Sequence, residues 1–251
     1  MKAVIMAGGK GTRLRPLTQG MPKPMLKLLH RPTLEYIVEL LASHGITDIA
    51  MTLCYLPETI RNHFGDGNNF GVNIQYLEEQ VPLGTAGGVK QMDWFLDDTF
   101  VVMSGDGVMD FDLGEAIAAH RQGRALATIL LKRVECPKGY GVVEVDDDGR
   151  IAKFVEKPRT WIEGISYLIN TGVYILEPEV FDFIPQAIAY DFGKDLFPSL
   201  LQLGVPLCGF EANGYWSDVG TLQQYYQTQL DMVHGHVKVN LPDELKVADF
   251  A

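Results

Sequence analysis

The stretch AGGKGTRLRPLTQGMPKP, residues 7–24, directly follows a short apolar and β-branched run, KAVIMA (2–7). The stretch combines glycines and prolines with two arginines, two lysines and no acidic residue. In open α/β sheets, ligands bind beyond the carboxyl ends of the parallel strands. A basic, glycine-rich loop directly after the first strand therefore predicts an α/β fold with an anion site at that edge of the sheet.

The charge of this loop differs from that of the chain as a whole. Of the 251 residues, 32 are Asp or Glu and 21 are Lys or Arg, so the formal net charge is −11. Residues 1–34 nevertheless contain seven of the basic residues and no Asp or Glu. Nucleic-acid-binding and membrane-surface proteins present a broad basic face. We therefore expect no nucleic-acid partner and no membrane, and a small polyanion fits the loop better.

Beyond the loop, short β-branched runs alternate with helical patterns. A helix is predicted over TLEYIVELLASHG (33–45), which begins after Pro32 and ends at Gly45. The alternation continues as far as ALATILLKRV (125–134). It indicates a Rossmann-like α/β fold, with a mainly parallel mixed sheet flanked by helices and right-handed crossovers.

The rhythm changes in the second half of the chain. YGVVEVDDDGRIAKFVEKP (140–158) reads as a hairpin with its turn at DDDG. It predicts an antiparallel part that covers the carboxyl edge of the sheet. TLQQYYQTQLDMVHG (221–235) predicts a last helix.

Composition also bears on the compartment. No apolar run approaches the roughly 18 residues of a membrane span, and the N-terminus is too short and too glycine-rich for a signal peptide. We expect a cytoplasmic protein. Cys54, Cys136 and Cys208 are scattered, which supports neither a disulfide framework nor a zinc site. The oligomeric state stays open, a homo-oligomer included.

Two familiar phosphate-binding loops do not fit residues 7–24. The dinucleotide fingerprint G-x-G-x-x-G would run from Gly9 through Gly11 to position 14, which is Leu14. The Walker pattern fails because no glycine stands five residues before a G-K-[ST] triplet. There remain glycine N–H groups that can approach an anion, Arg13 placed for bidentate phosphate contact, and Lys23 in a rigid PKP frame.

The loop belongs to a series of motifs that resembles the sugar-1-phosphate nucleotidylyltransferases, and most of all their mannose-1-phosphate guanylyltransferase-like branch. The motifs follow in the family's order over roughly residues 1–235: AGGKGTRLRPLT (7–18), PKPML (22–26), PLGTAGG (82–88), VMSGDGVMD (102–110), VEKP (155–158), NTGVYIL (170–176) and GYWSDVGT (214–221). The resemblance implies a nucleotidyltransferase domain over residues 1–235. Residues 236–251 then form a C-terminal tail that starts an appended domain.

The activity implied by the resemblance joins an NTP to a hexose 1-phosphate, giving an NDP-sugar and pyrophosphate. GTP with mannose 1-phosphate comes first, and UTP or dTTP with glucose 1-phosphate comes next. A non-catalytic nucleotide-sugar sensor is the alternative of another class, although Lys23, Asp106 and Asp218, whose loss would favour it, are all present.

The resemblance also implies roles for single residues. Arg13 and Lys23 are the catalytic cations, and Asp106 and Asp218 hold a catalytic Mg²⁺, for which two carboxylates with substrate phosphates and water are suitable ligands. By the residues alone, Asp106 can also be a turn residue and Asp218 a helix N-cap. The nucleotide-binding residues are Ala7, Gly8, Gly9, Gly11, Thr12, Gly84, Thr85 and Gly88. The sugar-phosphate-binding residues are Gly141, Glu156, Lys157, Asn170 and Thr171.

Overall fold

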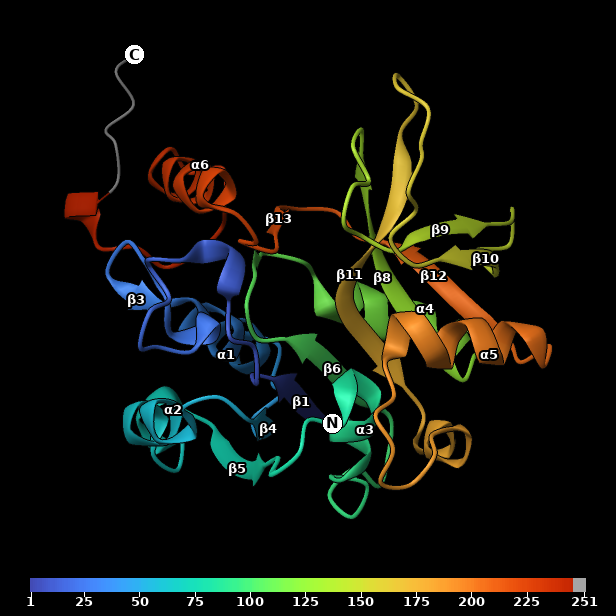
Figure 1. The fold of residues 1–251 in the computed structure, drawn as a ribbon, viewed down its shortest axis with the longest axis horizontal. Helices are drawn as coiled ribbons and strands as arrows, with labels where there is room; N and C mark the ends of the chain where they lie inside the picture. Colours follow the sequence, from blue (N-terminus) through green and yellow to red (C-terminus); the bar gives the residue numbers. More distant parts are fainter. Residues whose placement is uncertain (246–251) are drawn as a thin grey trace.

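The computed structural model of the protein describes residues 1–245. Its centre is a nine-stranded sheet with the order β10-β9-β11-β6-β1-β4-β5, in which β8 pairs with β11 and with β12. Four neighbouring strands are parallel, and they form the half of the sheet drawn from blue to green in Figure 1: β6 (Phe100–Ser104), β1 (Lys2–Met6), β4 (Asp48–Leu53) and β5 (Asn73–Glu78).

The other half of the sheet is mostly antiparallel. β11 (Tyr167–Leu176) runs antiparallel to β6, β8 (Ala127–Val134) and β9 (Val142–Val145). β9 pairs with β10 (Ile151–Val155) through the predicted DDDG turn, and β12 (Leu207–Glu211) lies parallel to β8. The predicted α/β fold with a mixed sheet and an antiparallel part is confirmed.

Helices cover both faces of the sheet because the side chains of each strand alternate between them. In β1, Ala3 and Ile5 pack into one core and Val4 into the other. The first core is closed by α1 (Thr33–Ser43), α2 (Pro57–Phe64) and α4 (Leu113–Gly123). The second is closed by α3 (Gly84–Lys90) and α5 (Phe197–Gln202). Short helical turns complete the connections: η1 (Thr12–Leu14), η2 (Lys23–Met25), η3 (Asn68–Phe70), η4 (Pro178–Phe183), η5 (Phe192–Leu196) and η6 (Asp243–Leu245).

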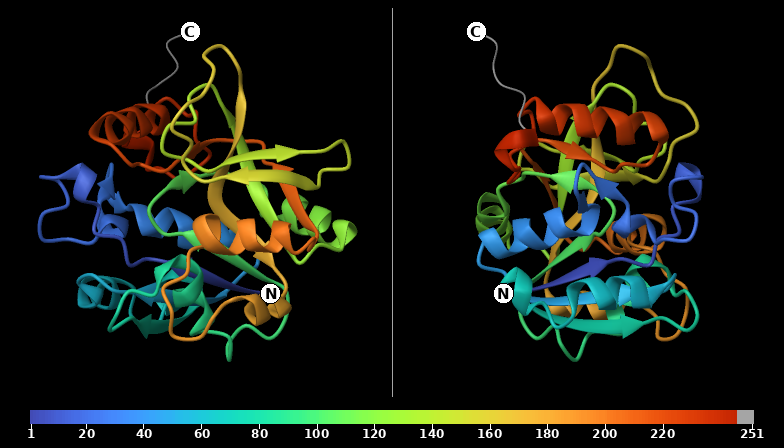
Figure 2. Two further views of the ribbon diagram at one scale, coloured as in Figure 1. Left: turned by 45° about the vertical axis from the view of Figure 1, so that its right-hand side comes forward. Right: turned by 90° about the vertical axis from the view of Figure 1, so that its left-hand side faces the viewer.

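The predicted last helix is α6 (Leu222–Val233), capped by the Thr221 hydroxyl, which accepts from the Gln224 N–H. Both views of Figure 2 place α6 at the opposite end of the molecule from α2 and β5. Two small antiparallel ladders lie toward this end, β2 (Lys27–Leu28) with β3 (Arg31–Pro32), and β7 (Val108–Met109) with β13 (Trp216–Ser217).

The chain after α6 packs through Val237 and Leu241 into a third, smaller core that also contains Tyr36. The Lys238 N–H donates to Asp110 Oδ2, and Arg31 donates to the carbonyl of Asn240. The prediction that residues 236–251 start a further domain stays a prediction, and residues 246–251 lie outside the described part of the chain. Within residues 1–245, no helix is both long and apolar enough to cross a membrane.

Candidate active site

The loop after β1 folds back on the segment that carries Lys23. The Lys23 N–H donates to the Gly9 carbonyl at 3.0 Å. Gly11 has a left-handed backbone, with φ of 62°, and a Cβ there would lie 2.8 Å from the Lys23 Cβ. Glycine is therefore required at position 11 both by its conformation and by this close approach. The backbone of Lys23, a residue only 6% exposed, is thus fixed against this loop.

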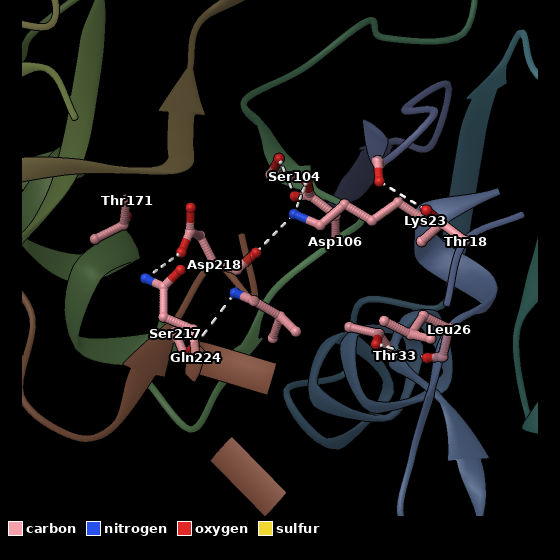
Figure 3. A network of polar contacts seen from close by, with 12 residues as sticks. Thr18, Lys23, Leu26, Thr33, Ser104, Asp106, Thr171, Ser217, Asp218 and Gln224 are labelled. Carbon is pink, nitrogen blue, oxygen red and sulfur yellow. Dashed lines mark hydrogen bonds and ion pairs between the residues drawn. The ribbon is translucent and has the colours of Figure 1, made fainter. Parts of the chain in front are cut away.

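The Lys23 ammonium lies between the two aspartates that the sequence singles out. Its Nζ donates to Asp106 Oδ2 at 2.7 Å and to the backbone carbonyl of Asp218 at 2.7 Å (Figure 3). The contact to Asp218 thus involves its main chain, and its carboxylate is held elsewhere. The structure brings Lys23, Asp106 and Asp218 together at one point.

The β7–β13 ladder explains how residues so distant in sequence come together. Asp106 lies between β6 and β7, and Asp218 directly follows β13. In the ladder, Val108 pairs with Ser217. A Cβ on Gly107 would lie 2.7 Å from the Ser217 carbonyl oxygen, so the two backbones can approach only because position 107 is glycine. The ladder therefore sets the spacing of the two aspartates.

Uncharged donors reach only one oxygen of each of the two carboxylates. Asp106 Oδ1 accepts from the Ser104 hydroxyl at 2.8 Å. Asp218 Oδ1 accepts from the Tyr140 hydroxyl at 3.0 Å and from Gln224 Nε2 at 2.9 Å. Since the N-cap of α6 is Thr221, the interpretation of Asp218 as a helix cap does not hold.

Tyr140 remains a hydrogen-bond donor at neutral pH. Burial raises the pKa of Tyr140 to about 12, and the negative charge of Asp218 acts in the same direction. The positive charge of Arg13 has the smaller, opposite effect on the pKa of Tyr140. Arg13 itself is exposed on η1 and forms no ion pair within residues 1–245.

Next to this point lies a cleft of about 400 Å³ beyond the carboxyl ends of β1, β4 and β6. Of the predicted nucleotide-binding residues, it is lined by Gly8, Gly9, Gly84 and Thr85. Ala7, Gly11, Thr12 and Gly88 lie in the surrounding loop and helix without lining it. The position is the one expected for a ligand of an open α/β sheet.

Glu79 occupies the part of this cleft between β5 and α3. Its Oε1 is buried and has no hydrogen-bond partner within residues 1–245. A Cβ on Gly88 would lie 2.5 Å from that oxygen, so the glycine of α3 makes room for the carboxyl group. Burial raises the pKa of Glu79, against the effect of a hydrogen bond from the Leu83 backbone. A buried acceptor without a partner is costly and calls for an explanation.

A second pocket of about 340 Å³ adjoins the first and contains three of the predicted sugar-phosphate-binding residues, Glu156, Lys157 and Asn170. Lys157 Nζ pairs with Glu156 Oε1 at 2.9 Å. The other two predicted residues stand behind this lining. Gly141 leaves room for Glu156, whose Oε2 would lie 2.7 Å from a Cβ there, and the buried Thr171 hydroxyl donates to the Leu130 carbonyl.

Asp191 and Thr85 line both pockets and join them into one cleft. The Thr85 hydroxyl donates to Asp191 Oδ1 at 2.9 Å and accepts from the Phe192 N–H at 3.0 Å. The Thr85 hydroxyl is thus already hydrogen-bonded within the protein, so Thr85 would contact a ligand through its backbone. The long cleft suits a substrate pair with two separate ends.

Sequence reasoning did not single out Glu79, Tyr140, Asp191 or Gln224. Tyr140 directly precedes Gly141, and Gln224 stands three residues after Thr221 in a T-x-x-Q capping pattern, but neither pattern points to an aspartate. For Asp191 there is no local signal, because its partner Thr85 is 106 residues away in the chain.

The chemistry of the cleft fits a magnesium ion. Residues 1–245 contain no cluster of three or more His, Cys, Asp or Glu side chains placed to hold a metal. Mg²⁺ does not require one, since it is commonly bound by one or two carboxylates together with substrate phosphates and water. Asp106 and Asp218 supply two such carboxylates, and Asp218 Oδ2 has no donor within the described residues.

Comparison with known proteins assigns the chain. The nucleotidyl transferase profile matches residues 2–234. The chain belongs to the nucleotidyl transferase family. A UTP–glucose-1-phosphate uridylyltransferase of Synechocystis sp. is 43% identical over an alignment of 257 positions, and the match covers 96% of this chain and 66% of that protein. A mannose-1-phosphate guanylyltransferase of Mycobacterium tuberculosis is 37% identical over 235 residues, covering 93% and 65%.

These nucleotidyl transferase relatives confirm the resemblance to sugar-1-phosphate nucleotidylyltransferases, and the chain spans 66% and 65% of their lengths. Solved structures agree in fold. A protein of Bacillus anthracis described as a glucose-1-phosphate thymidylyltransferase, in complex with a sucrose, matches with a TM-score of 0.83, 25% identity and coverage of 98% of both chains. HddC of Yersinia pseudotuberculosis complexed with GMP-PN matches with a TM-score of 0.79, 27% identity and coverage of 92% of this chain and 99% of that one.

Proposed function

We propose that this chain transfers a nucleotidyl group from an NTP to a hexose 1-phosphate, giving an NDP-sugar and pyrophosphate. The observation that carries the proposal is the buried Lys23 ammonium, held between the backbone carbonyl of Asp218 and the carboxylate of Asp106, which lines the larger of two adjoining pockets. The larger pocket receives the nucleotide and the smaller one, with Lys157, receives the sugar phosphate.

In this reaction an oxygen of the sugar phosphate attacks the α-phosphorus of the NTP. The bond from the α-phosphorus to the bridging oxygen breaks, and pyrophosphate leaves in line. Both reactants are anions, so catalysis consists mainly of positioning and charge neutralisation. Lys23 neutralises charge at the reacting α-phosphate, while the Gly8–Gly11 backbone and Arg13 hold the remaining NTP phosphates.

Asp106 and Asp218 would hold Mg²⁺, which, when bound, supplies further charge neutralisation on the phosphates. The chain's own residues prepare this arrangement. Ser104 donates to Oδ1 of Asp106, and Tyr140 donates to Oδ1 of Asp218. The Oδ2 atom of each carboxylate is left for other partners. In the structure as it stands, Lys23 takes up Asp106 Oδ2.

For the base we propose guanine, on the basis of Glu79. Guanine presents two adjacent N–H donors, and an ionised carboxylate, which only accepts, matches both. Uracil and thymine present one N–H between two carbonyl oxygens, and a carboxylate repels both of these oxygens. Oε1 is sealed from solvent against Gly88, so guanine would satisfy it only after the Glu79 side chain turns into the cleft. A protonated Glu79 would resemble an amide and accept uracil, so the ionisation of one group separates the two candidate bases.

For the sugar we propose mannose 1-phosphate, with glucose 1-phosphate as the second candidate. Both rest on the substrates in the names of the relatives. The cytoplasm, where NTPs are abundant, is the proposed place of the reaction.

The test is a screen of the common NTPs against mannose, glucose and N-acetylglucosamine 1-phosphates with Mg²⁺, in which the release of pyrophosphate is measured. We expect turnover, with the highest kcat/KM for GTP. Absence of turnover with every pair would refute the proposed activity. A preference of the unmodified protein for UTP or dTTP would refute only the assignment of the base.

The role of Glu79 is tested with Glu79→Gln, which keeps the shape and supplies an amide. We expect the ratio of kcat/KM for GTP over UTP to fall by about 10²-fold, a typical size for a lost hydrogen-bond match. Because the ionised carboxylate reads guanine, this ratio should rise with pH in the unmodified protein and stay level in the variant. Glu78→Gln, which alters the exposed neighbour paired with Arg61, serves as the matched control and should change neither.

A further inference from the structure

Tyr140 and Gln224 form a closed arrangement with the carboxylate of Asp218. Gln224 Nε2 donates to the Tyr140 hydroxyl at 2.7 Å and to Asp218 Oδ1 at 2.9 Å. The Tyr140 hydroxyl, having accepted from Gln224, donates to the same Oδ1 at 3.0 Å. Both amide hydrogens and the hydroxyl hydrogen are used, so the three groups have one consistent hydrogen-bond pattern.

We propose that Tyr140 and Gln224 are positioning residues, which fix the Asp218 carboxylate with Oδ2 free for a divalent cation. The catalytic use of that cation rests on the proposed function. The orientation of the Asp218 carboxylate does not depend on it. Hydrogen bonds from neighbouring side chains commonly orient the ligands of a metal and set its affinity.

The orientation of Gln224 is itself fixed. Its Oε1 lies 3.1 Å from the hydroxyl of Thr221, the N-cap of α6. With the amide oxygen engaged there, the amide nitrogen faces Asp218 rather than the reverse. The Gln224 N–H also bonds to the Thr221 hydroxyl at 3.1 Å, so the first turn of α6 holds this side chain at both ends.

The other oxygen of Asp218 is kept open. Oδ2 accepts no hydrogen bond from any of residues 1–245. A Cβ on Gly220 would lie 2.7 Å from Oδ2, closer than real Cβ atoms approach such an atom. The two donors thus occupy one oxygen of the carboxylate, and the absence of a side chain at position 220 leaves the other accessible.

The two residues act from behind the carboxylate and not from inside the cleft. Tyr140 and Gln224 line a pocket of about 470 Å³ that shares no lining residue with the nucleotide cleft or the sugar-phosphate pocket. The Tyr140 ring packs edge-on against Trp216, with centroids 5.4 Å apart. This placement supports a role through Asp218 and not through direct contact with substrate.

Tyr140 also connects Asp218 to the sugar-phosphate pocket. The Lys157 N–H donates to the Tyr140 carbonyl at 3.1 Å, and the Asn170 N–H donates to the neighbouring Gly141 carbonyl at 2.8 Å. The backbone at Tyr140 and Gly141 therefore also holds Lys157 and Asn170 of the sugar-phosphate pocket. A displacement of this segment would change the metal carboxylate and the sugar-phosphate pocket together.

The experiment measures Mn²⁺ binding to the purified chain by electron paramagnetic resonance, without substrates, for Tyr140→Phe and Gln224→Ala. We expect the dissociation constant to rise about tenfold in each variant. Tyr226→Phe and Gln223→Ala change the same residue types on the exposed side of α6 and are matched controls. They should bind Mn²⁺ like the unmodified protein.

Kinetics separate positioning from a general structural effect. Raising the Mg²⁺ concentration should restore most of the turnover of Tyr140→Phe, because its defect lies in metal affinity. In an Asp218→Asn background, Tyr140→Phe should cause no further loss of Mn²⁺ affinity. Unchanged Mn²⁺ affinity in both single variants, or a further loss in that background, would overturn the inference. If Mn²⁺ binding responds as expected while no NTP and sugar pair is turned over, the proposed function fails and the inference stands.

Discussion

Replacing Lys23 by methionine removes the ammonium and keeps most of the side-chain volume. The variant should lose turnover and gain affinity for a divalent cation, two effects with one cause. The ammonium lies 2.7 Å from Asp106 Oδ2, an oxygen that the metal would use. At an effective dielectric constant of about 20, unit charges at this separation attract by about 6 kcal/mol before the cost of desolvation.

The size of each effect follows from that charge. Loss of one preorganised charge at a reaction centre typically lowers kcat by about 10²- to 10³-fold. Relief of the competition for Asp106 should tighten Mn²⁺ binding at least about tenfold, which requires only about 1.4 kcal/mol. Turnover is measured by pyrophosphate release and Mn²⁺ affinity by electron paramagnetic resonance, with Lys27→Met at the exposed Lys27 as control. Turnover within about threefold of normal, or weaker Mn²⁺ binding, would refute this reasoning.

Three further predictions concern single residues. Lys157→Ala should raise KM for the sugar phosphate by about tenfold or more and leave KM for the NTP nearly unchanged, as steady-state kinetics with each substrate varied would test. Gly107→Ala should lower the free energy of unfolding by about 1–3 kcal/mol and reduce turnover, because its Cβ would lie 2.7 Å from the Ser217 carbonyl oxygen and separate β7 from β13; an unchanged melting temperature would contradict this. Glu79→Gln should raise the melting temperature at neutral pH. Burial raises the pKa of Glu79, so the ionised side chain destabilises the fold above that pKa, and glutamine removes this cost. Below the pKa of a free glutamate, the melting temperatures of the two proteins should converge.

Local patterns predict the parts of the fold that depend on neighbouring residues. The apolar run of β1, the periodicity of α1 and the turn at Gly149 each lie within a few residues, and the structure has all three. The alternation of strands and helices also predicted the parallel sheet. Predicting that Lys23, Asp106 and Asp218 belong to one site was possible only through the order of the family motifs, since nothing in their spacing brings them together.

Long-range polar contacts could not be predicted in this way. Tyr140 and Gln224 are 84 residues apart, and their contact depends on how α6 packs against the loop before β9. Glu79 can be buried only because position 88, in the helix that follows it in sequence, is a glycine. Such contacts arise when separate elements pack, and each element taken alone is compatible with a plain turn or a solvated surface.

The proposed attack on the α-phosphorus is tested most directly by following two labels. The chain is incubated with Mg²⁺, a hexose 1-phosphate and the NTP that the substrate screen favours, labelled either at the α-phosphate or at the γ-phosphate, and the products are separated by chromatography. The reaction at the Lys23 site requires the α-label to appear in the NDP-sugar and the γ-label in pyrophosphate, in equal amounts and only when the sugar phosphate is present. Release of the γ-label as inorganic phosphate, or recovery of both labels in unchanged NTP, would contradict the proposed transfer.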